Sequence, residues 1–384
     1  MRTRRSEIVH VDVTRARARA RSLLPLLLLL AGCPHHSTSD KPSPTKDDAS
    51  THAPPGADAG NGSTSDVTLP PAPPLPAVPA GLPPLPDTPA ISAITPDALA
   101  LGTLLFYEPR LSATGKIACA TCHDPAHGYS GGIDNAADGK PDLRRTPALV
   151  NLAWASSFGW DGRYPSIDLL LHTHVSGQLG DDLSRAVSRL EDLPDYKAHF
   201  ARVGGAPQDA ASQALAAFVL TRYAGDAPWD RREPSARAPK PGGPPDAATA
   251  GYLLFTGKAQ CAVCHTPPLY TDYGFARIGK VGVPDEGRGR VDPTLVGAFK
   301  TPTLRGAAAR KALFHTGDVT SLDDAIRWYE LVGADTTHHD PAKLHPALFH
   351  IALSPEEHAQ LLAFLRALTS DTPAPAAPKL PQAR

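Results

Sequence analysis

Apolar residues recur at helical spacing in five segments of the chain, whereas the alternating pattern of strands is weak throughout. These segments cover residues 95–105, 211–222, 246–255, 322–331 and 355–368. The first begins at Thr95-Pro96, where a capping threonine precedes a proline at the first helical position. Loops rich in glycine and proline, such as DNAADGKPD, lie between the segments. The pattern therefore predicts an all-α fold with short helices and long loops.

The same order of motifs occurs twice. LGTLLF at 101–106 matches AGYLLF at 250–255, and RTPALVN at 145–151 matches KTPTLRG at 300–306. From the TP pairs onward the offset is constant at 155, since Thr146 corresponds to Thr301 and Ser166 to Ser321. We therefore expect two domains related by internal duplication, one over residues 95–235 and one over residues 236–370.

The N-terminal segment carries an export pattern. Arginines precede the run LLPLLLLL, which is too short to span a bilayer, and this order is typical of a signal peptide over residues 1–33. The run ends in LAGC, which resembles the lipobox of bacterial lipoproteins. That resemblance implies a lipid on Cys33 and a chain anchored on the periplasmic side, at the outer membrane rather than the inner one. An ordinary signal peptide with an incidental cysteine is the alternative.

Composition changes the picture mainly at the two ends. The chain holds 42 prolines, concentrated outside the helical segments. Residues 34–94 and 371–384 contain few large apolar side chains, so we expect a disordered tether and a disordered tail. A net charge of -1 and the lack of any block of like charge argue against a nucleic-acid partner.

Four of the five cysteines belong to two CxxCH motifs, one in each repeat. CxxCH is the attachment motif of c-type haem, in which both thiols bond to the porphyrin and the histidine binds iron. A zinc site would need the two pairs to converge, and a redox CxxC does not require the histidine. The sequence therefore predicts two covalent haems c. Their cofactor-binding residues are Cys119, Cys122 and His123 in the first repeat and Cys261, Cys264 and His265 in the second.

Several longer motifs give a more specific identification. LGTLLFYEPRLSATGKIACATCHDP, RRTPALVNLAW, FGWDGR, GAFKTPTLRG and FHTGDVTSLDDAIRWYE resemble the bacterial dihaem cytochrome c peroxidase and MauG family over residues 95–370. The resemblance implies two cytochrome c-like domains, with a peroxide-reacting haem in the first and an electron-transfer haem in the second. It also implies a small periplasmic electron donor, a cytochrome c or a cupredoxin. In MauG-like members a partner protein is oxidised instead.

The resemblance also suggests the sixth ligand of the second haem iron. Met1 is the only methionine, so the folded part cannot form a His/Met haem. The position of the peroxidases' methionine falls on Tyr329, and MauG-type enzymes have tyrosine there. We therefore expect His265 and Tyr329 as the two iron ligands, the alternative being that Tyr329 is a core residue of its helix.

The first haem departs from the family pattern. The distal loop histidine of the peroxidases is missing from residues 135–142. By the offset of 155, His174 corresponds to Tyr329, where MauG-type enzymes have a proline in the first domain. His174 is our candidate acid/base for O–O cleavage, with iron ligation or an exposed histidine as alternatives. The family's glutamate and glutamine are absent from the aligned positions, and Asp181, Asp182 and Gln178 are the nearby substitutes.

Two further residues match family positions. Trp160 corresponds to the tryptophan that relays electrons between the haems, and its repeat partner is His315. Asn151 corresponds to a ligand of the inter-domain calcium, so one calcium ion is a further expectation. Arg310 and Lys311, however, place positive charge in the stretch that supplies the remaining calcium ligands.

These inferences favour a dihaem peroxidase that reduces hydrogen peroxide at the first haem with electrons delivered through the second. MauG-like oxidation of a partner protein is one alternative. A non-catalytic electron-transfer or sensor protein is another, and His174 together with the missing glutamate favours it.

The lipobox resemblance gives a direct test. Cells fed a labelled fatty acid should incorporate the label into the wild-type chain but not into Cys33→Ser, because the thiol is the attachment point. The label is measured on the purified chain by gel fluorescence. A wild-type chain without label in a host that labels its other lipoproteins would contradict the lipid anchor.

Overall fold

The computed structural model describes residues 67–132, 139, 143–232, 244–279, 285–333, 344–349 and 351–382. Within these ranges the chain is mostly helical with two short strands, which confirms the expected all-α fold. The proposed signal peptide, Cys33 and residues 34–66 lie outside the described residues, as does most of the loop at 135–142. No helix in the described ranges has the length and apolar character needed to cross a membrane.

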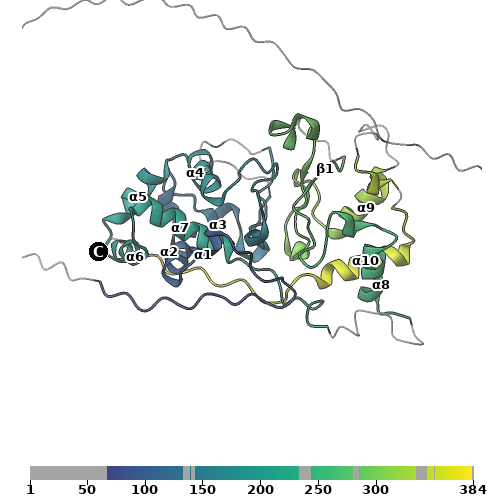
Figure 1. Cartoon of the computed structure of the whole chain (residues 1–384), viewed down its shortest axis with the longest axis horizontal. Coiled ribbons are helices and arrows are strands. Elements are labelled where there is room, and N and C mark those ends of the chain that lie inside the picture. Colours follow the sequence, from purple (N-terminus) through teal and green to yellow (C-terminus); the bar gives the residue numbers. More distant parts are fainter. Residues whose placement is uncertain are drawn as a thin grey trace, which may run out of the picture. The chain divides into compact units, whose positions relative to one another are not determined.

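The helices of the first repeat gather around α7 (Pro207–Leu220), whose residues are buried along most of its length (Figure 1). The other helices of this group are α1 (Pro89–Ser92), α2 (Pro96–Phe106), α3 (Cys119–Cys122), α4 (Ile167–Gln178), α5 (Leu183–Glu191) and α6 (Pro194–Val203). Thr95 caps α2 as expected, because its side chain accepts a hydrogen bond from the Ala98 amide.

The second repeat forms a smaller group with its own aromatic core (Figure 1). Its helices are α8 (Ala247–Thr256), α9 (Leu322–Val332) and α10 (Pro355–Ala367), and its strands β1 (Phe275–Ala276) and β2 (Phe299–Lys300) pair antiparallel. Phe364 of α10 is fully buried and contacts the rings of Trp229, Phe255 and Tyr270. Short 3-10 turns complete the described chain at Pro109–Leu111, Pro125–His127, Leu152–Trp154, Cys261–Val263, Arg288–Arg290, Pro293–Leu295, Ala307–Ala309 and Pro346–Leu348.

The sequence repeat is also a structural repeat. Helices α4 and α9 begin after Ser166 and Ser321, which lie 155 positions apart, and each serine side chain accepts a hydrogen bond from the amide three residues later. An isolated bridge precedes each helix, Phe158–Tyr164 in the first repeat and Leu313–Val319 in the second. Equivalent residues of the two repeats are therefore delivered to equivalent places on their helices.

Two equivalent glycines allow the central helices to approach each other closely. A Cβ on Gly102 of α2 would lie 1.9 Å from the Ala214 carbonyl oxygen of α7. A Cβ on Gly251 of α8 would lie 2.0 Å from the Gln360 carbonyl oxygen of α10. Since both contacts are with backbone, no side-chain rearrangement relieves them, and glycine is required at both positions.

Residues 67–94 and 371–382, which we expected to be disordered, are described in the structure and hydrogen-bond to the folded part. Their carbonyl oxygens accept hydrogen bonds from folded side chains: Pro70 from Arg202 (2.6 Å), Gly81 from Arg305 (2.5 Å), Pro84 from Trp154 (2.9 Å) and Pro381 from Arg110 (2.7 Å). Prolines lack an N–H, so a proline-rich segment offers few hydrogen-bond donors to its own carbonyls. Proline-rich chain is also pre-extended, which lowers the entropy lost on binding.

Filling the glycine contact should destabilise the fold. Gly251→Val should lower the free energy of unfolding by about 3 kcal/mol, because the new side chain forces α8 away from α10. The measurement is urea denaturation of the haem-containing protein followed by circular dichroism. Gly177→Ala in α4 is the matched control, since nothing lies within 4 Å of that position. Equal stability of Gly251→Val and wild type would contradict this account of the helix pair.

Candidate functional site

The first cavity holds the first CxxCH motif on one side and helix α4 on the other. It encloses about 2080 Å³ of empty space, part of it open to solvent. Cys119, Cys122 and His123 line it from α3 and its C-terminal end. Helix α4 contributes Ile167, Leu170, Leu171, His174 and Gln178, one face of the helix at intervals of three or four residues.

His123 is held in a defined orientation inside this cavity. Its ring is buried, and its Nδ1 lies 3.1 Å from the Tyr129 carbonyl oxygen, which leaves Nε2 for a metal. Burial, and next the neighbouring His174, lower the pKa of His123 to about 3. The imidazole is therefore neutral at physiological pH, as a metal ligand must be.

The second cavity is built in the same way and encloses about 1300 Å³ of empty space, including open solvent. Cys261, Cys264 and His265 line it, and the His265 Nδ1 lies 3.1 Å from the Tyr270 carbonyl oxygen. Helix α9 lines the opposite wall with Leu322, Ala325, Ile326 and Tyr329, the counterparts of Ile167, Leu170, Leu171 and His174. Burial, followed by the nearby thiols of Cys261 and Cys264, raises the pKa of Tyr329 above its usual range.

These donor sets fit haem c. Each cavity pairs two thiols and an oriented neutral imidazole with a largely apolar lining, which is what covalent attachment of a porphyrin requires. Burial raises the pKa of Cys119 and of Cys261 to about 12, so these thiols carry their protons. A zinc site made of all four thiols would need the two pairs to converge on one ion. The two cysteine pairs line different cavities, as the haem prediction requires.

Trp160 lies between the two cavities and lines both of them. Its ring is buried, its Nε1 donates a hydrogen bond to the Arg145 carbonyl oxygen at 2.9 Å, and the Arg145 guanidinium lies 4.9 Å from its ring centre. Its centroid is 6.4 Å from that of His315, which stacks on Phe299 at 3.5 Å. Trp160 and His315, which are repeat partners, therefore lie against each other beside both cavities.

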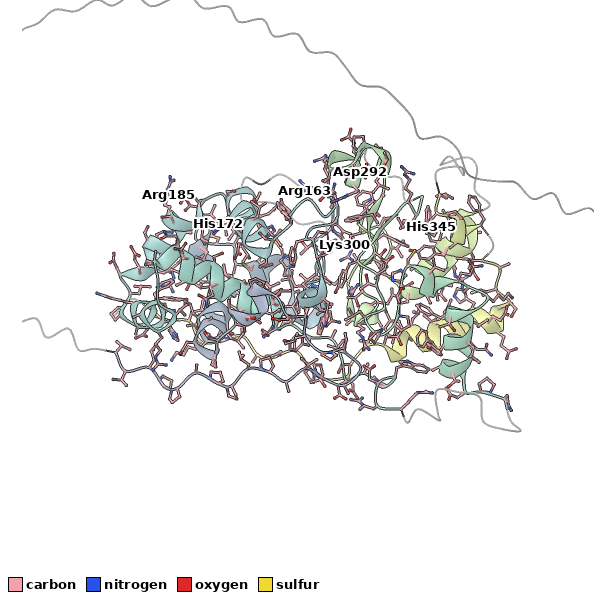
Figure 2. The ribbon with its side chains drawn as sticks, viewed as in Figure 1. Arg163, His172, Arg185, Asp292, Lys300 and His345 are labelled. Carbon is pink, nitrogen blue, oxygen red and sulfur yellow. The ribbon has the colours of Figure 1, made fainter. Side chains whose placement is uncertain are left out.

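Three cations line both cavities, namely Arg145, Lys300 and Arg310. Sequence reasoning named only Arg310, and only as positive charge near the expected calcium site. Burial lowers their pKa values to about 9, about 8 and about 10. Figure 2 places Lys300 between the two groups of helices. Arg145 and Lys300 are repeat partners directly before the two TP pairs, and this equivalence could have identified them. Every haem carries two carboxylates, and these cations suit them as partners.

Asp181 and His127 do not line either cavity. Asp181 is not among the residues that line the first cavity; its buried carboxylate accepts a hydrogen bond from Arg189 at 2.5 Å. That pairing gives Asp181 a structural role, so the structure does not support its assignment as an acid/base. Gln178, a substitute considered in the same region, does line the cavity. His127 pairs with Asp124 at 2.8 Å and is partly exposed.

The side chains around Asn151 do not fit a calcium ion. The Asn151 amide is occupied at both ends, accepting from the Ala224 amide at 2.8 Å and donating to its carbonyl at 3.1 Å. The Arg310 guanidinium is buried and donates to the carbonyls of Thr303 and Arg305 at 2.9 and 2.8 Å. Across the described part of the chain no cluster of three or more acidic, histidine or cysteine side chains could hold a metal ion.

Comparisons with known proteins agree with this geometry. A family model described as di-haem cytochrome c peroxidase matches residues 96–234. The chain is 35% identical over 303 residues to the methylamine utilization protein MauG of Methylorubrum extorquens, a match that covers 75% of this chain and 82% of that protein. It is 29% identical over 357 residues to the cytochrome-c peroxidase IdrP1 of Denitromonas iodatirespirans, covering 82% of this chain and 90% of that protein.

The fold has a counterpart among solved structures. A MauG-like protein associated with microbial copper homeostasis superposes with a TM-score of 0.67 at 24% identity, covering 77% of this chain and 95% of that one. At this identity the likeness concerns the fold alone.

The occupied Asn151 amide and the buried Arg310 predict that calcium has no stabilising effect. Removal of divalent cations with EDTA should leave the melting temperature of the haem-containing protein unchanged, and added calcium should not raise it. Calorimetry on chelator-treated protein measures both. A melting temperature that falls with EDTA and recovers with calcium would show that an ion binds despite these contacts.

Proposed function

The chain belongs to the family of dihaem cytochrome c peroxidases and MauG proteins, and from this premise we propose that it reduces hydrogen peroxide at the haem held by His123. It is an oxidoreductase of this family, and electrons reach the first haem through the haem held by His265. The observation that carries the proposal is that Trp160 lines both cavities and is hydrogen-bonded and stacked in place between them.

The haem, when bound, supplies the redox chemistry, and the residues around it bind, orient and move protons. His123 offers Nε2 to the iron, because Nδ1 is engaged by the Tyr129 carbonyl. His174 and Gln178 are the polar side chains that α4 presents to the cavity, so they are the groups available to hold or move a proton on that wall. Apolar residues of α4 and the Trp160 region limit the access of water.

The route between the cavities is short and buried. Trp160 contacts the Arg145 guanidinium, and its ring lies 6.4 Å from His315, whose own ring stacks on Phe299. A cation over the indole disfavours removal of an electron from it, so Arg145 makes Trp160 harder to oxidise. We therefore assign Trp160 the relay and Arg145 the tuning of that relay.

MauG-like oxidation of a partner protein is the second candidate. Tyr329 favours it, because it lines the second cavity opposite the CxxCH motif, where MauG-type enzymes carry a tyrosine. Two relatives named methylamine utilization protein MauG, at 35% and 32% identity, point the same way. In this candidate the electrons come from side chains of the partner rather than from a soluble carrier.

We further propose that the protein works on the periplasmic side of a bacterial membrane, held by a lipid on Cys33. Haem attachment to CxxCH occurs outside the bacterial cytoplasm, which supports export. A small periplasmic cytochrome c or cupredoxin is then the electron donor that can reach it.

Steady-state turnover of hydrogen peroxide with a reduced small cytochrome c tests the function and the relay together. Trp160→Phe should lower the turnover at least tenfold while both haems remain bound, because the variant lacks the indole through which electrons pass between the haems. Trp154→Phe is the matched control, since that indole lies outside both cavities and donates to the Pro84 carbonyl.

Three outcomes separate the alternatives. Wild-type protein with two haems that consumes no peroxide with any donor, protein or chemical, would refute the proposed function. Peroxide consumption that requires a partner protein and leaves its side chains oxidised would favour the MauG-like candidate. Equal loss in the two tryptophan variants would remove the relay role of Trp160.

A further inference from the structure

His174 and Tyr329 occupy the same place on equivalent helices. Each lies eight residues after the capping serine of its helix. In each helix, the three cavity-lining residues that precede it are apolar. The helix face that presents Tyr329 to the second cavity therefore presents His174 to the first. The duplicated scaffold places a potential iron ligand opposite a CxxCH histidine in both repeats.

The spacing of the two imidazoles in the first cavity is informative. The ring centroids of His123 and His174 are 6.0 Å apart, and the ring planes are tilted by 53°. Two imidazoles bound to opposite sides of one metal ion through bonds of about 2 Å have ring centres roughly 6 Å apart. A distal histidine that only hydrogen-bonds to a small ligand lies further away, by about the 3 Å of that hydrogen bond.

We propose that His174 binds the first haem iron opposite His123 in the resting protein, so that this haem is six-coordinate and closed. The inference rests on the proposed function and adds a regulatory step to it. The Nε2 lone pair of the neutral imidazole forms the bond, and no electron or proton is transferred. Peroxide can then reach the iron only after the bond between His174 and iron breaks.

Helix α4 is suited to releasing its histidine. Of its described residues only Ile167 and Val175 are buried, whereas Leu169 is 47% exposed. A helix held by few buried contacts opens locally at a small cost in free energy. The ligand is thus carried by an element that contributes only two fully buried side chains to the core around α7.

Ferric electron paramagnetic resonance and absorption spectra of the two-haem protein test the proposal. His174→Ala should add one haem equivalent of high-spin signal that wild type lacks, and added imidazole should restore the low-spin state. His172→Ala is the matched control, because this histidine lies on the same helix, is exposed and does not line the cavity (Figure 2). Total haem is measured in every variant by the pyridine haemochrome method, which separates ligand loss from failure to attach haem.

The kinetics of peroxide binding give a second readout. Mixed with peroxide, His174→Ala should react without the delay that wild type shows, since no ligand has to leave. A wild-type ferric spectrum that already contains a high-spin first haem, unchanged in His174→Ala, would overturn the ligation even if the protein reduces peroxide well. Spectra that support ligation, in a wild-type protein with two haems that consumes no peroxide with any donor, would instead refute the proposed function.

Discussion

The hydrogen bond between each CxxCH histidine and a backbone carbonyl is the constraint on which the rest of the site depends. It fixes the ring of His123 on Tyr129 and the ring of His265 on Tyr270, and it decides which nitrogen faces the cavity. With that nitrogen aimed across the cavity, the identity of the residue on the opposite helix determines what the metal can bind. The two cavities share the oriented histidine and the apolar helix face, and they differ at the equivalent positions His174 of α4 and Tyr329 of α9.

Duplication explains both the symmetry and the division of labour. The capping serines, the preceding bridges and the apolar cavity faces are shared by both repeats. Three of the differences involve residues that line the cavities: His174 against Tyr329, Trp160 against His315, and Arg145 against Lys300. An imidazole lines one cavity and a phenol lines the other, and the aromatic pair meets where the cavities adjoin. In the proposed function, one scaffold thereby supports a peroxide-reacting centre and an electron-transfer centre.

Much of this could be predicted from the sequence, because periodicity, caps and the CxxCH spacing are local. The helices α2, α7, α8, α9 and α10 and both CxxCH motifs fall into that class. Asp181 was misjudged because its partner Arg189 lies on the next helix and withdraws it from the cavity, which no local pattern reveals. Composition did not predict that the proline-rich segments bind to the fold. It indicates how much apolar surface a segment can bury, but not which arginines of the folded part donate hydrogen bonds to its carbonyls.

The binding of the proline-rich N-terminal segment has a consequence for how far the catalytic body can reach. Arg202 holds the Leu69 and Pro70 carbonyls against α6, so the described chain is bound to the fold well before the first repeat begins. With a lipid on Cys33, as we propose, the stretch from residue 33 to residue 69 would let the folded part lie at most about 120 Å from the membrane surface when fully extended. The electron donor would have to be met within that radius of the membrane surface.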